Sequence, residues 1–198
     1  ALRRITLCAE GIAMATETTV SREFITYTHN KLPNKTLSEV VHRNFEYYGT
    51  PEFTEEEQNF VKKMQEYMGL EPVGLDTKLK EFGPSETIIC DTSEFSWNAP
   101  YATFWVAMGP DKGWHNWMVT ACAGNSIGKK TMDKAVRIMS SSAIDIILSP
   151  ETIEAAKAEL KERLKGREYK CLLPEDHKPP LGTNKETMKK YFPERPFY

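Results

Sequence analysis

The sequence predicts an α/β protein, and three observations predict it. Amphipathic stretches that start at capping residues indicate helices, and short apolar runs rich in β-branched and aromatic residues indicate strands. The turn GPDKG at 109–113 separates two of those runs and suggests antiparallel neighbours. At 198 residues, 40% hydrophobic and 27% charged, the chain has the composition of an ordinary soluble globular protein with a sizeable core.

The first 69 residues predict the order helix, strand, helix, helix. Apolar residues at spacings of three and four predict a helix over 2–16, and the alternating stretch 18–28 predicts a strand that ends at the loop HNKLPN. Helices are expected next at 36–48 and 54–68, each opening with a threonine and a glutamate three residues later. These capping-box pairs are Thr36 with Glu39 and Thr54 with Glu57.

The middle of the chain predicts a long loop and then three strands. The loop, 70–86, is either functional or a connector, because such loops are uncommon inside compact domains. The strands are expected at 86–91, 101–108 and 114–123. The second and third are apolar almost throughout, as in central strands that are covered on both faces.

The last third predicts two helices and a tail. A long helix is expected over 130–148, and a second begins at the capping sequence Ser149-Pro150 and runs to about Leu164. The proline-rich stretch 178–198 is expected to be a docked arm or a mobile tail. One side of the long helix is apolar, with Met132, Ala135, Val136, Met139, Ala143, Ile146 and Ile147.

Composition excludes several classes of function. A net charge of −2 gives no electrostatic reason to expect nucleic acid or an anionic membrane surface. No apolar run approaches the length needed to span a bilayer. The four scattered cysteines lack a C-x-x-C pair and favour reduced thiols in the cytoplasm over a disulfide framework.

The most suggestive residue is His115, which lies between Trp114 and Trp117 on a segment predicted to be a buried strand. An imidazole among indoles needs either a hydrogen bond, for example to a main-chain carbonyl, or a metal. Asp91 and Glu94 are possible acidic partners; the alternative is that DTSEFS caps a turn or helix. One histidine and two carboxylates do not by themselves make a metal site.

Two further signals are weaker. His29 lies where the predicted strand meets the HNKLPN loop, so it either faces a ligand or is an inert loop residue. The stretch GNSIGKK at 124–130 offers amides and lysines to an anion but lacks the spacing of a phosphate loop.

Several motifs, taken in order, resemble one group of enzymes. The group is the p-aminobenzoyl-glutamate hydrolase (utilization protein B) group of the aminoacylase/carboxypeptidase-type co-catalytic zinc metallopeptidases. The resemblance covers nearly the whole chain but only the later, C-terminal portion of such an enzyme. The motifs are CAEGIAMATET, HNKLPNKTLSEVV, FSWNAP, WHNW, SSSAIDIILSPETIEAAKAEL and YKCLLPEDHKPP.

The resemblance implies a two-domain parent. Residues 1–29 match the last helix and strand of an inserted lid domain that mediates dimerisation. Residues 30–177 match the C-terminal part of a mixed-sheet, zinc-exopeptidase-like catalytic domain, and 178–198 form the proline-rich C-terminal arm.

The resemblance also implies the chemistry: hydrolysis of an amide between an acyl or aminobenzoyl group and an amino acid, with two Zn or Mn ions in the complete enzyme. His115 matches the last metal ligand. Asn30 and Asn34 are the nearest matches to the lid contact for the substrate carboxylate, with His29 beside them. The other ligands and the glutamate base belong to the absent N-terminal half, so no catalytic residue is assigned here.

Two hypotheses follow from these observations. The first is an amidohydrolase portion that is inactive, and binds metal poorly, without the N-terminal half of the enzyme. Lys129–Lys130 stand where the family often has a histidine–lysine pair, so no second histidine role is assigned. In this first hypothesis the partners of the chain would be a small amide substrate, that N-terminal half and a second copy of the enzyme, bound through the lid elements. The second hypothesis is a non-catalytic assembly module that retains the fold and finds a partner through an unpaired sheet edge.

Overall fold

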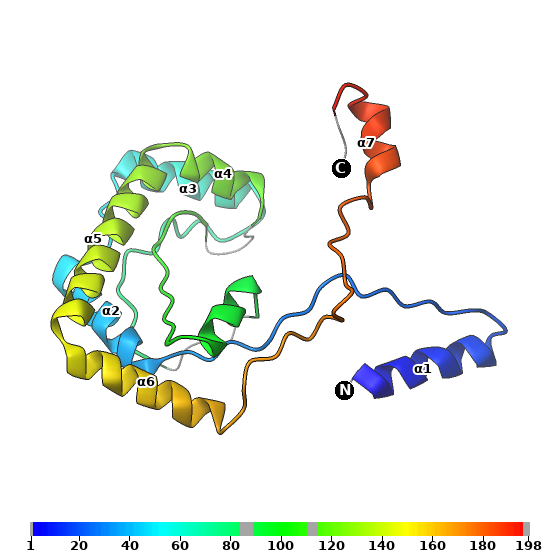
Figure 1. Ribbon diagram of the computed structural model, residues 1–198. Helices are drawn as coiled ribbons and strands as arrows, with labels where there is room; N and C mark the ends of the chain where they lie inside the picture. The colour runs from blue at the N-terminus through cyan, green and yellow to red at the C-terminus, as the bar shows by residue number, and fades with distance from the viewer. Residues whose placement is uncertain (1, 84–88, 111–114, 196–198) are drawn as a thin grey trace. The chain divides into compact units, whose positions relative to one another are not determined.

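The computed structural model describes residues 2–83, 89–110 and 115–195, which form helices joined by extended segments (Figure 1). The chain divides into two compact units, His29–Tyr169 and the pair Ala1–Thr28 with Lys170–Tyr198. The assignment of 1–29 to a lid, 30–177 to a catalytic domain and 178–198 to an arm stays a prediction.

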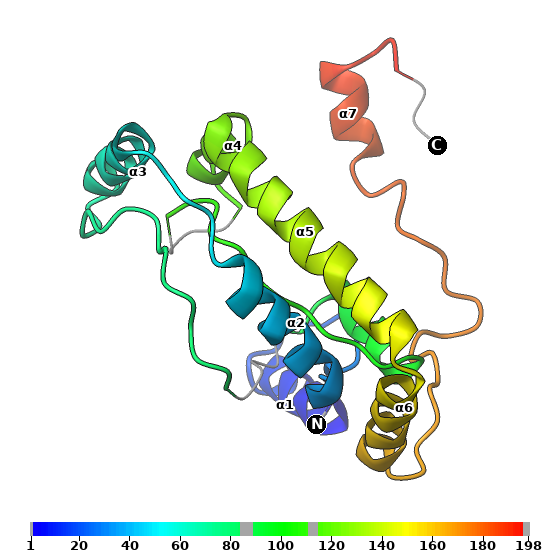
Figure 2. The same ribbon diagram turned by 90° about the vertical axis from the view of Figure 1, so that its left-hand side faces the viewer.

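The larger unit is built around one long helix. This helix, α5, packs along α2, and α6 contacts both of them (Figure 2). None of the described helices is both long and apolar enough to cross a membrane. The helical elements of this unit are α2 (Lys35–Tyr48), α3 (Glu55–Tyr67), the 3-10 helix η1 (Asp91–Trp97), α4 (Trp117–Ala123), α5 (Ser126–Leu148) and α6 (Pro150–Leu164).

Capping residues explain where α2 and α3 begin. The capping box predicted at Thr54 is confirmed, because its hydroxyl accepts the Glu57 N–H and the Glu57 carboxylate accepts the Thr54 N–H. The capping box predicted at Thr36 is wrong. The cap of α2 is Asn34, whose side chain accepts the Leu37 N–H, while the Thr36 N–H donates to Glu159.

Two apolar clusters form the core of the larger unit. The first joins α3, the loop after it, α4 and the start of α5; the second joins the HNKLPN loop to η1 and α6. Burying the large Trp97 ring in the second cluster fixes η1 against the loop. The members of the first are Val61, Met64, Leu75, Met118, Cys122 and Ile127, and those of the second are Leu32, Trp97 and Leu160.

The strand predicted at 114–123 is wrong, because Trp117–Ala123 is the helix α4. The Asn116 side chain accepts the N–H groups of Met118 and Val119 at 2.9 and 3.4 Å, and so caps a helix. Of the strand predicted at 86–91, residues 86–88 lie outside the described residues, and η1 begins at Asp91.

The predicted mixed sheet stays a prediction. Residues 18–28 and 101–108 are extended, but no residue that the structure describes forms a strand ladder. Along the second segment, the Tyr101 carbonyl accepts the Asn34 N–H and the Ala107 carbonyl accepts the Thr131 hydroxyl. A strand needs neighbours for its main-chain groups, so an apolar pattern alone gives extended backbone here.

The helix predicted at 130–148 is confirmed within α5, but its apolar side is not the buried side. Residues such as Ile127 and Ile138 face the core. The predicted apolar side is instead exposed, with Met132, Val136, Met139 and Ile147 between 49% and 71% exposed. This outer face of α5, defined as Met132, Val136, Met139, Ala143 and Ile147, is exposed in the part of the chain that the structure describes.

The smaller unit contains α1 (Leu2–Ala15), which confirms the first predicted helix, and α7 (Lys185–Tyr191) within the predicted arm. In this unit, two polar contacts join residues that are far apart in sequence. Arg22 donates to the Thr6 hydroxyl at 2.5 Å, and the His177 ring lies 3.2 Å from the Ile25 carbonyl.

Candidate functional site

The HNKLPN loop and η1 bring His29 and Glu94 together. The His29 main-chain N–H donates to Glu94 Oε1 at 2.5 Å, and the imidazole Nδ1 lies 2.9 Å from Oε2. The two side chains are 13% and 28% exposed. One carboxylate therefore holds both the main chain and the ring of a histidine that is 65 residues away in sequence.

Two aromatic rings fix the orientation of the imidazole. The Trp97 ring lies 4.7 Å from the His29 ring and the Tyr169 ring lies 5.4 Å from it, measured between centroids. We call His29, Glu94 and Trp97 the His29–Glu94 site. Packing on two sides and a hydrogen bond on a third leave the ring little freedom to rotate.

The contact with Glu94 also sets the tautomer of His29. Burial raises the pKa of Glu94, but hydrogen bonds from the His29 main chain, the His29 ring and Tyr169 outweigh it and hold the pKa below its usual range. An ionised carboxylate only accepts hydrogen bonds, so Nδ1 carries the hydrogen. In that tautomer Nε2 is an acceptor, and no described residue engages it.

Buried hydrogen bonds join the loop to η1 beneath this pair. The Leu32 N–H donates to Ser96 Oγ at 2.9 Å, and the Ser96 hydroxyl donates to the Ser93 carbonyl at 2.5 Å. Trp97 Nε1 donates to the Asn30 carbonyl at 2.8 Å. Both serines are fully buried, and these hydrogen bonds pair the buried polar groups between the loop and η1.

The two asparagines predicted to bind a substrate carboxylate differ in exposure and in how far their side-chain hydrogen-bonding groups are already used. Asn34 is 1% exposed, and its side chain accepts the Leu37 N–H and donates to the Ala156 carbonyl. Asn30 is exposed, and its amide makes one long contact, 3.4 Å, to the Lys31 carbonyl. Both roles stay predictions, and Asn30 is the more available to a ligand.

The buried environment predicted for His115 is wrong. The segment turns into α4 here, and His115 is exposed with a positive φ of 68°. Trp114 lies outside the described residues. Of the acidic partners considered, Asp91 accepts the Thr92 N–H and Glu94 is held by His29.

A two-metal centre does not fit the described residues on their own. No group of three or more His, Cys, Asp or Glu side chains among them is placed to hold a metal ion. A stable zinc site takes three or four protein ligands, so His115 would need ligands from elsewhere. Its role as a metal ligand stays a prediction.

The sequence predicted that the lysines of GNSIGKK offer positive charge to a bound anion. In the structure, Lys130 instead contacts a carboxylate of the same chain, that of Glu57. Its Nζ donates to Glu57 at 2.7 Å, and the Ser126 hydroxyl donates to the same carboxylate at 2.5 Å. Burial raises the pKa of Glu57, but hydrogen bonds from Lys130, Ser126 and Thr54 outweigh it and lower the pKa to about 2. We call these four residues the Glu57 network.

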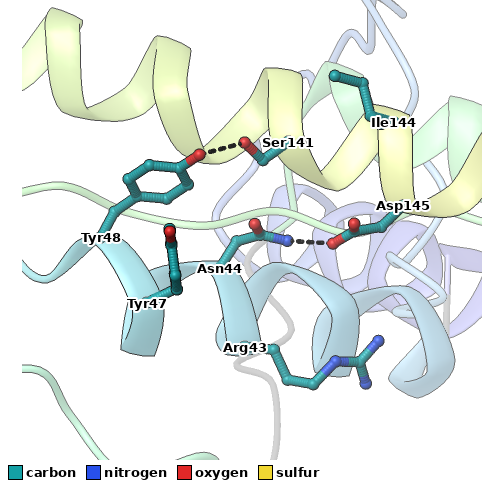
Figure 3. Close-up of a pocket in the computed structure, with 7 residues that line it drawn as sticks. All are labelled: Arg43, Asn44, Tyr47, Tyr48, Ser141, Ile144 and Asp145. Carbon is teal, nitrogen blue, oxygen red and sulfur yellow. Dashed lines mark hydrogen bonds between the residues drawn. The ribbon is translucent and has the colours of Figure 1, made fainter.

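A shallow pocket of about 370 Å³ lies between α2 and α5 (Figure 3). Two hydrogen bonds cross it: the Tyr48 and Ser141 hydroxyls lie 2.7 Å apart, and the Asn44 amide donates to Asp145 at 2.7 Å. These bonds join the two helices, so the four polar side chains that form them are already paired with one another. Its other lining residues are Arg43, Tyr47 and Ile144.

Sequence reasoning selected His29 and Glu94 separately but assigned Glu94 to His115. No local pattern links segments so far apart; the one signal was that His29 belongs to HNKLPN, a motif of the resemblance, and that Glu94 directly precedes another such motif, FSWNAP. Lys31 was not predicted as a site residue, yet it is only 5% exposed. A lysine in a polar loop gives no sequence sign of such burial.

No protein-family model and no solved structure matches the chain. The chain is similar to one of the subunits of p-aminobenzoyl-glutamate hydrolase from Escherichia coli (strain K12), with 24% identity over 205 residues. The similar region covers 89% of this chain and 43% of that protein, so the chain spans less than half the length of this curated relative. The resemblance drawn from the motifs is confirmed.

Proposed function

We propose that this chain, given its similarity to a p-aminobenzoyl-glutamate hydrolase polypeptide, is a portion of an amide hydrolase. The proposed substrates are amides that join an acyl or aminobenzoyl group to an amino acid, such as p-aminobenzoyl-glutamate. The observation that carries the proposal is that HNKLPN and FSWNAP, two motifs of the resemblance, meet at the His29–Glu94 site, where Trp97 contacts the His29 ring and donates to the Asn30 carbonyl.

In this proposal His29 contacts the substrate and Glu94 is a positioning residue. Glu94 holds the Nδ1 hydrogen, so Nε2 is presented in one orientation and can accept a hydrogen bond or a proton. Asn30 next to it offers an exposed amide for a carboxylate. Holding a ring in its productive orientation before substrate arrives lowers the entropy cost of reaching the transition state.

Metal dependence is proposed for the complete enzyme only. Two Zn or Mn ions there would polarise the amide carbonyl and activate water, but the described residues do not fit such a centre alone. His115 is proposed to add one ligand to others from outside this chain. No role of His29 or Glu94 depends on that assignment.

The proposal requires partners. The relative is named as a subunit, and the chain spans 43% of its length. We propose that a further portion of polypeptide supplies the remaining catalytic residues, that a second copy associates through residues 1–29, and that the assembly works in the cytoplasm.

A second candidate is a non-catalytic assembly module, and the outer face of α5 favours it. A row of exposed large apolar side chains along a helix is typical of a surface that binds protein. Both candidates need a partner for that face. They differ in whether the resulting complex cleaves an amide.

Complementation separates the two candidates. The chain is mixed with the part of the Escherichia coli relative outside the matched region, Zn or Mn is added, and release of glutamate from p-aminobenzoyl-glutamate is measured. We expect hydrolysis by the mixture only. Binding of the two polypeptides without any hydrolysis would instead support the assembly module.

A matched pair of variants tests the site itself. His29→Gln should lower the rate of the mixture about tenfold or more, because the positioned ring is lost. His42→Gln is the control, since His42 is also partly buried and lies near a glutamate, 3.7 Å from Glu46, but it is on α2 and outside the His29–Glu94 site. Equal effects of the two substitutions would remove His29 from the proposed site.

A further inference from the structure

Arg167 shares the Trp97 ring with His29. Its guanidinium carbon lies 5.0 Å from the centre of that ring, and the centre of the His29 imidazole lies 4.7 Å from it. Trp97 is 7% exposed and donates its Nε1 hydrogen to the Asn30 carbonyl, so the indole itself is fixed. One indole therefore holds an arginine and a histidine that come from segments far apart in sequence.

The end of α6 explains how Arg167 is held there. Lys165 and Gly166 both have positive φ, 50° and 75°, and turn the chain where the helix ends. Beyond that turn, the main-chain N–H and Nε of Arg167 both donate to the Leu164 carbonyl at 2.9 Å. Nη2 donates to the Arg163 carbonyl at 3.0 Å. These bonds give the guanidinium one orientation.

The same contacts leave the Arg167 charge without a carboxylate. Arg167 is exposed, and none of the ion pairs among the described residues includes it. Its partners, two carbonyl groups and an indole, are neutral. Glu94, the carboxylate of the His29–Glu94 site, is already engaged by His29.

A guanidinium in this state is suited to an anion from outside the chain. It stays charged at neutral pH, and stacking on an aromatic ring leaves the N–H groups in its own plane free to donate. No described residue engages Nη1 of Arg167. Two parallel N–H groups of a guanidinium match the two oxygens of a carboxylate.

We propose that Arg167 is a substrate-binding residue that recognises the side-chain carboxylate of an acidic amino acid. This inference rests on the proposed function, in which His29 contacts the substrate. Asn30 directly follows His29 and is assigned the carboxylate next to the amide. Arg167 reaches the site through Trp97 and is assigned the second carboxylate, which lies further along an acidic amino acid. The site then prefers amides of glutamate to amides of neutral amino acids.

The test compares two substrates that differ only in that second group. They are p-aminobenzoyl-glutamate and p-aminobenzoyl-glutamine, and kcat/KM is measured for both in the complemented mixture. We expect the wild type to prefer the glutamate substrate about tenfold or more. Arg167→Met should lose most of this preference through a higher KM, with kcat little changed. Arg167→Lys should keep part of it, because it keeps the charge but not the planar donors.

Arg163→Met is the matched control. Arg163 lies one turn earlier and carries the same charge, but its side chain pairs with Glu159. The substrate preference of this variant should equal that of the wild type. Hydrolysis with a preference unchanged in Arg167→Met, or lost equally in both variants, would overturn the role of Arg167 and leave the proposed function standing.

A second measurement decides where the mixture does not hydrolyse or Arg167→Met does not fold, which circular dichroism checks. The 198-residue chain is titrated with N-acetylglutamate and with N-acetylglutamine. Nitrogen NMR follows the Arg167 Nε–H signal, assigned by its absence in Arg167→Lys. N-acetylglutamate should shift this signal at lower concentration than N-acetylglutamine does. That result without hydrolysis would support the carboxylate site while contradicting the proposed function; equal shifts, or none, would overturn the site.

Discussion

Glu57 and Glu94 are both carboxylates held by hydrogen bonds, and in both the pKa lies below the usual range. They differ in their partners. Glu57 is 8% exposed and meets the ammonium of Lys130, whereas Glu94 meets a histidine whose second nitrogen no described residue engages. A lowered carboxylate pKa therefore does not by itself mark a functional site; what distinguishes Glu94 from Glu57 is a partner with an unused polar atom.

The largest expected effect on stability comes from Glu57→Gln. Losing the charge leaves the Lys130 ammonium and the Ser126 hydroxyl with a weaker partner, so we expect a loss of about 1–3 kcal/mol in the free energy of unfolding. Urea titration measures it. The control is Asp133→Asn in the exposed pair with Arg137, expected to change stability by less than about 0.5 kcal/mol. Equal losses in the two variants would show that the Glu57 network is not structural.

The pH dependence of that loss sharpens the same contrast. The pKa of Glu57 is lowered on folding from 4.5 to about 2, so its contribution is fully present above pH 4.5 and is lost as the pH falls towards 2. The difference in stability between wild type and Glu57→Gln should therefore shrink over that window. A difference that stays constant down to pH 2 would contradict the assigned network.

An intermediate effect is expected for Asn34→Ala. The substitution removes the cap of α2 and the hydrogen bond to the Ala156 carbonyl, and should cost about 1 kcal/mol or somewhat more. Thermal unfolding measures this loss. Asn30→Ala is the matched control and should be close to neutral, because its amide is exposed. The reverse order would mean that Asn30 has the structural role.

The smallest stability effect, about 1 kcal/mol or less, is expected for Glu94→Gln, because that side chain is more exposed. Its main effect should be on His29. Nitrogen NMR of the neutral ring should show hydrogen on Nδ1 in the wild type and a mixture of tautomers in the variant. An unchanged tautomer would mean that Glu94 does not orient the ring.

Local sequence patterns predicted the helices because their signals lie within a few residues. The Thr54–Glu57 capping box and the start of α6 at Ser149-Pro150 are examples. The strand at 114–123 failed because Asn116 caps a helix over an apolar run that suits either structure. Residues 101–108 are extended but form no strand ladder with described residues. A ladder requires a neighbouring strand, and the apolar pattern of one segment does not show whether such a neighbour exists.

The candidate site was only half predictable. His29 was selected from its loop position, but its bond to Glu94 spans 65 residues, and no short-range rule covers that distance. The burial of Lys31 could not be predicted for the same reason, since the ring over which its ammonium lies, Tyr101, is distant in sequence. His115 seemed buried because its neighbours are indoles, yet the chain turns there into α4.

The most direct test compares Glu94→Gln with Glu57→Gln in the complemented mixture, with the rate of p-aminobenzoyl-glutamate hydrolysis expressed per folded molecule. The account predicts that Glu94→Gln loses about tenfold or more in rate while remaining folded, and that Glu57→Gln keeps its rate but unfolds more easily. A full rate in Glu94→Gln, with the loss falling on Glu57→Gln instead, would contradict the assignment of the site to His29 and Glu94.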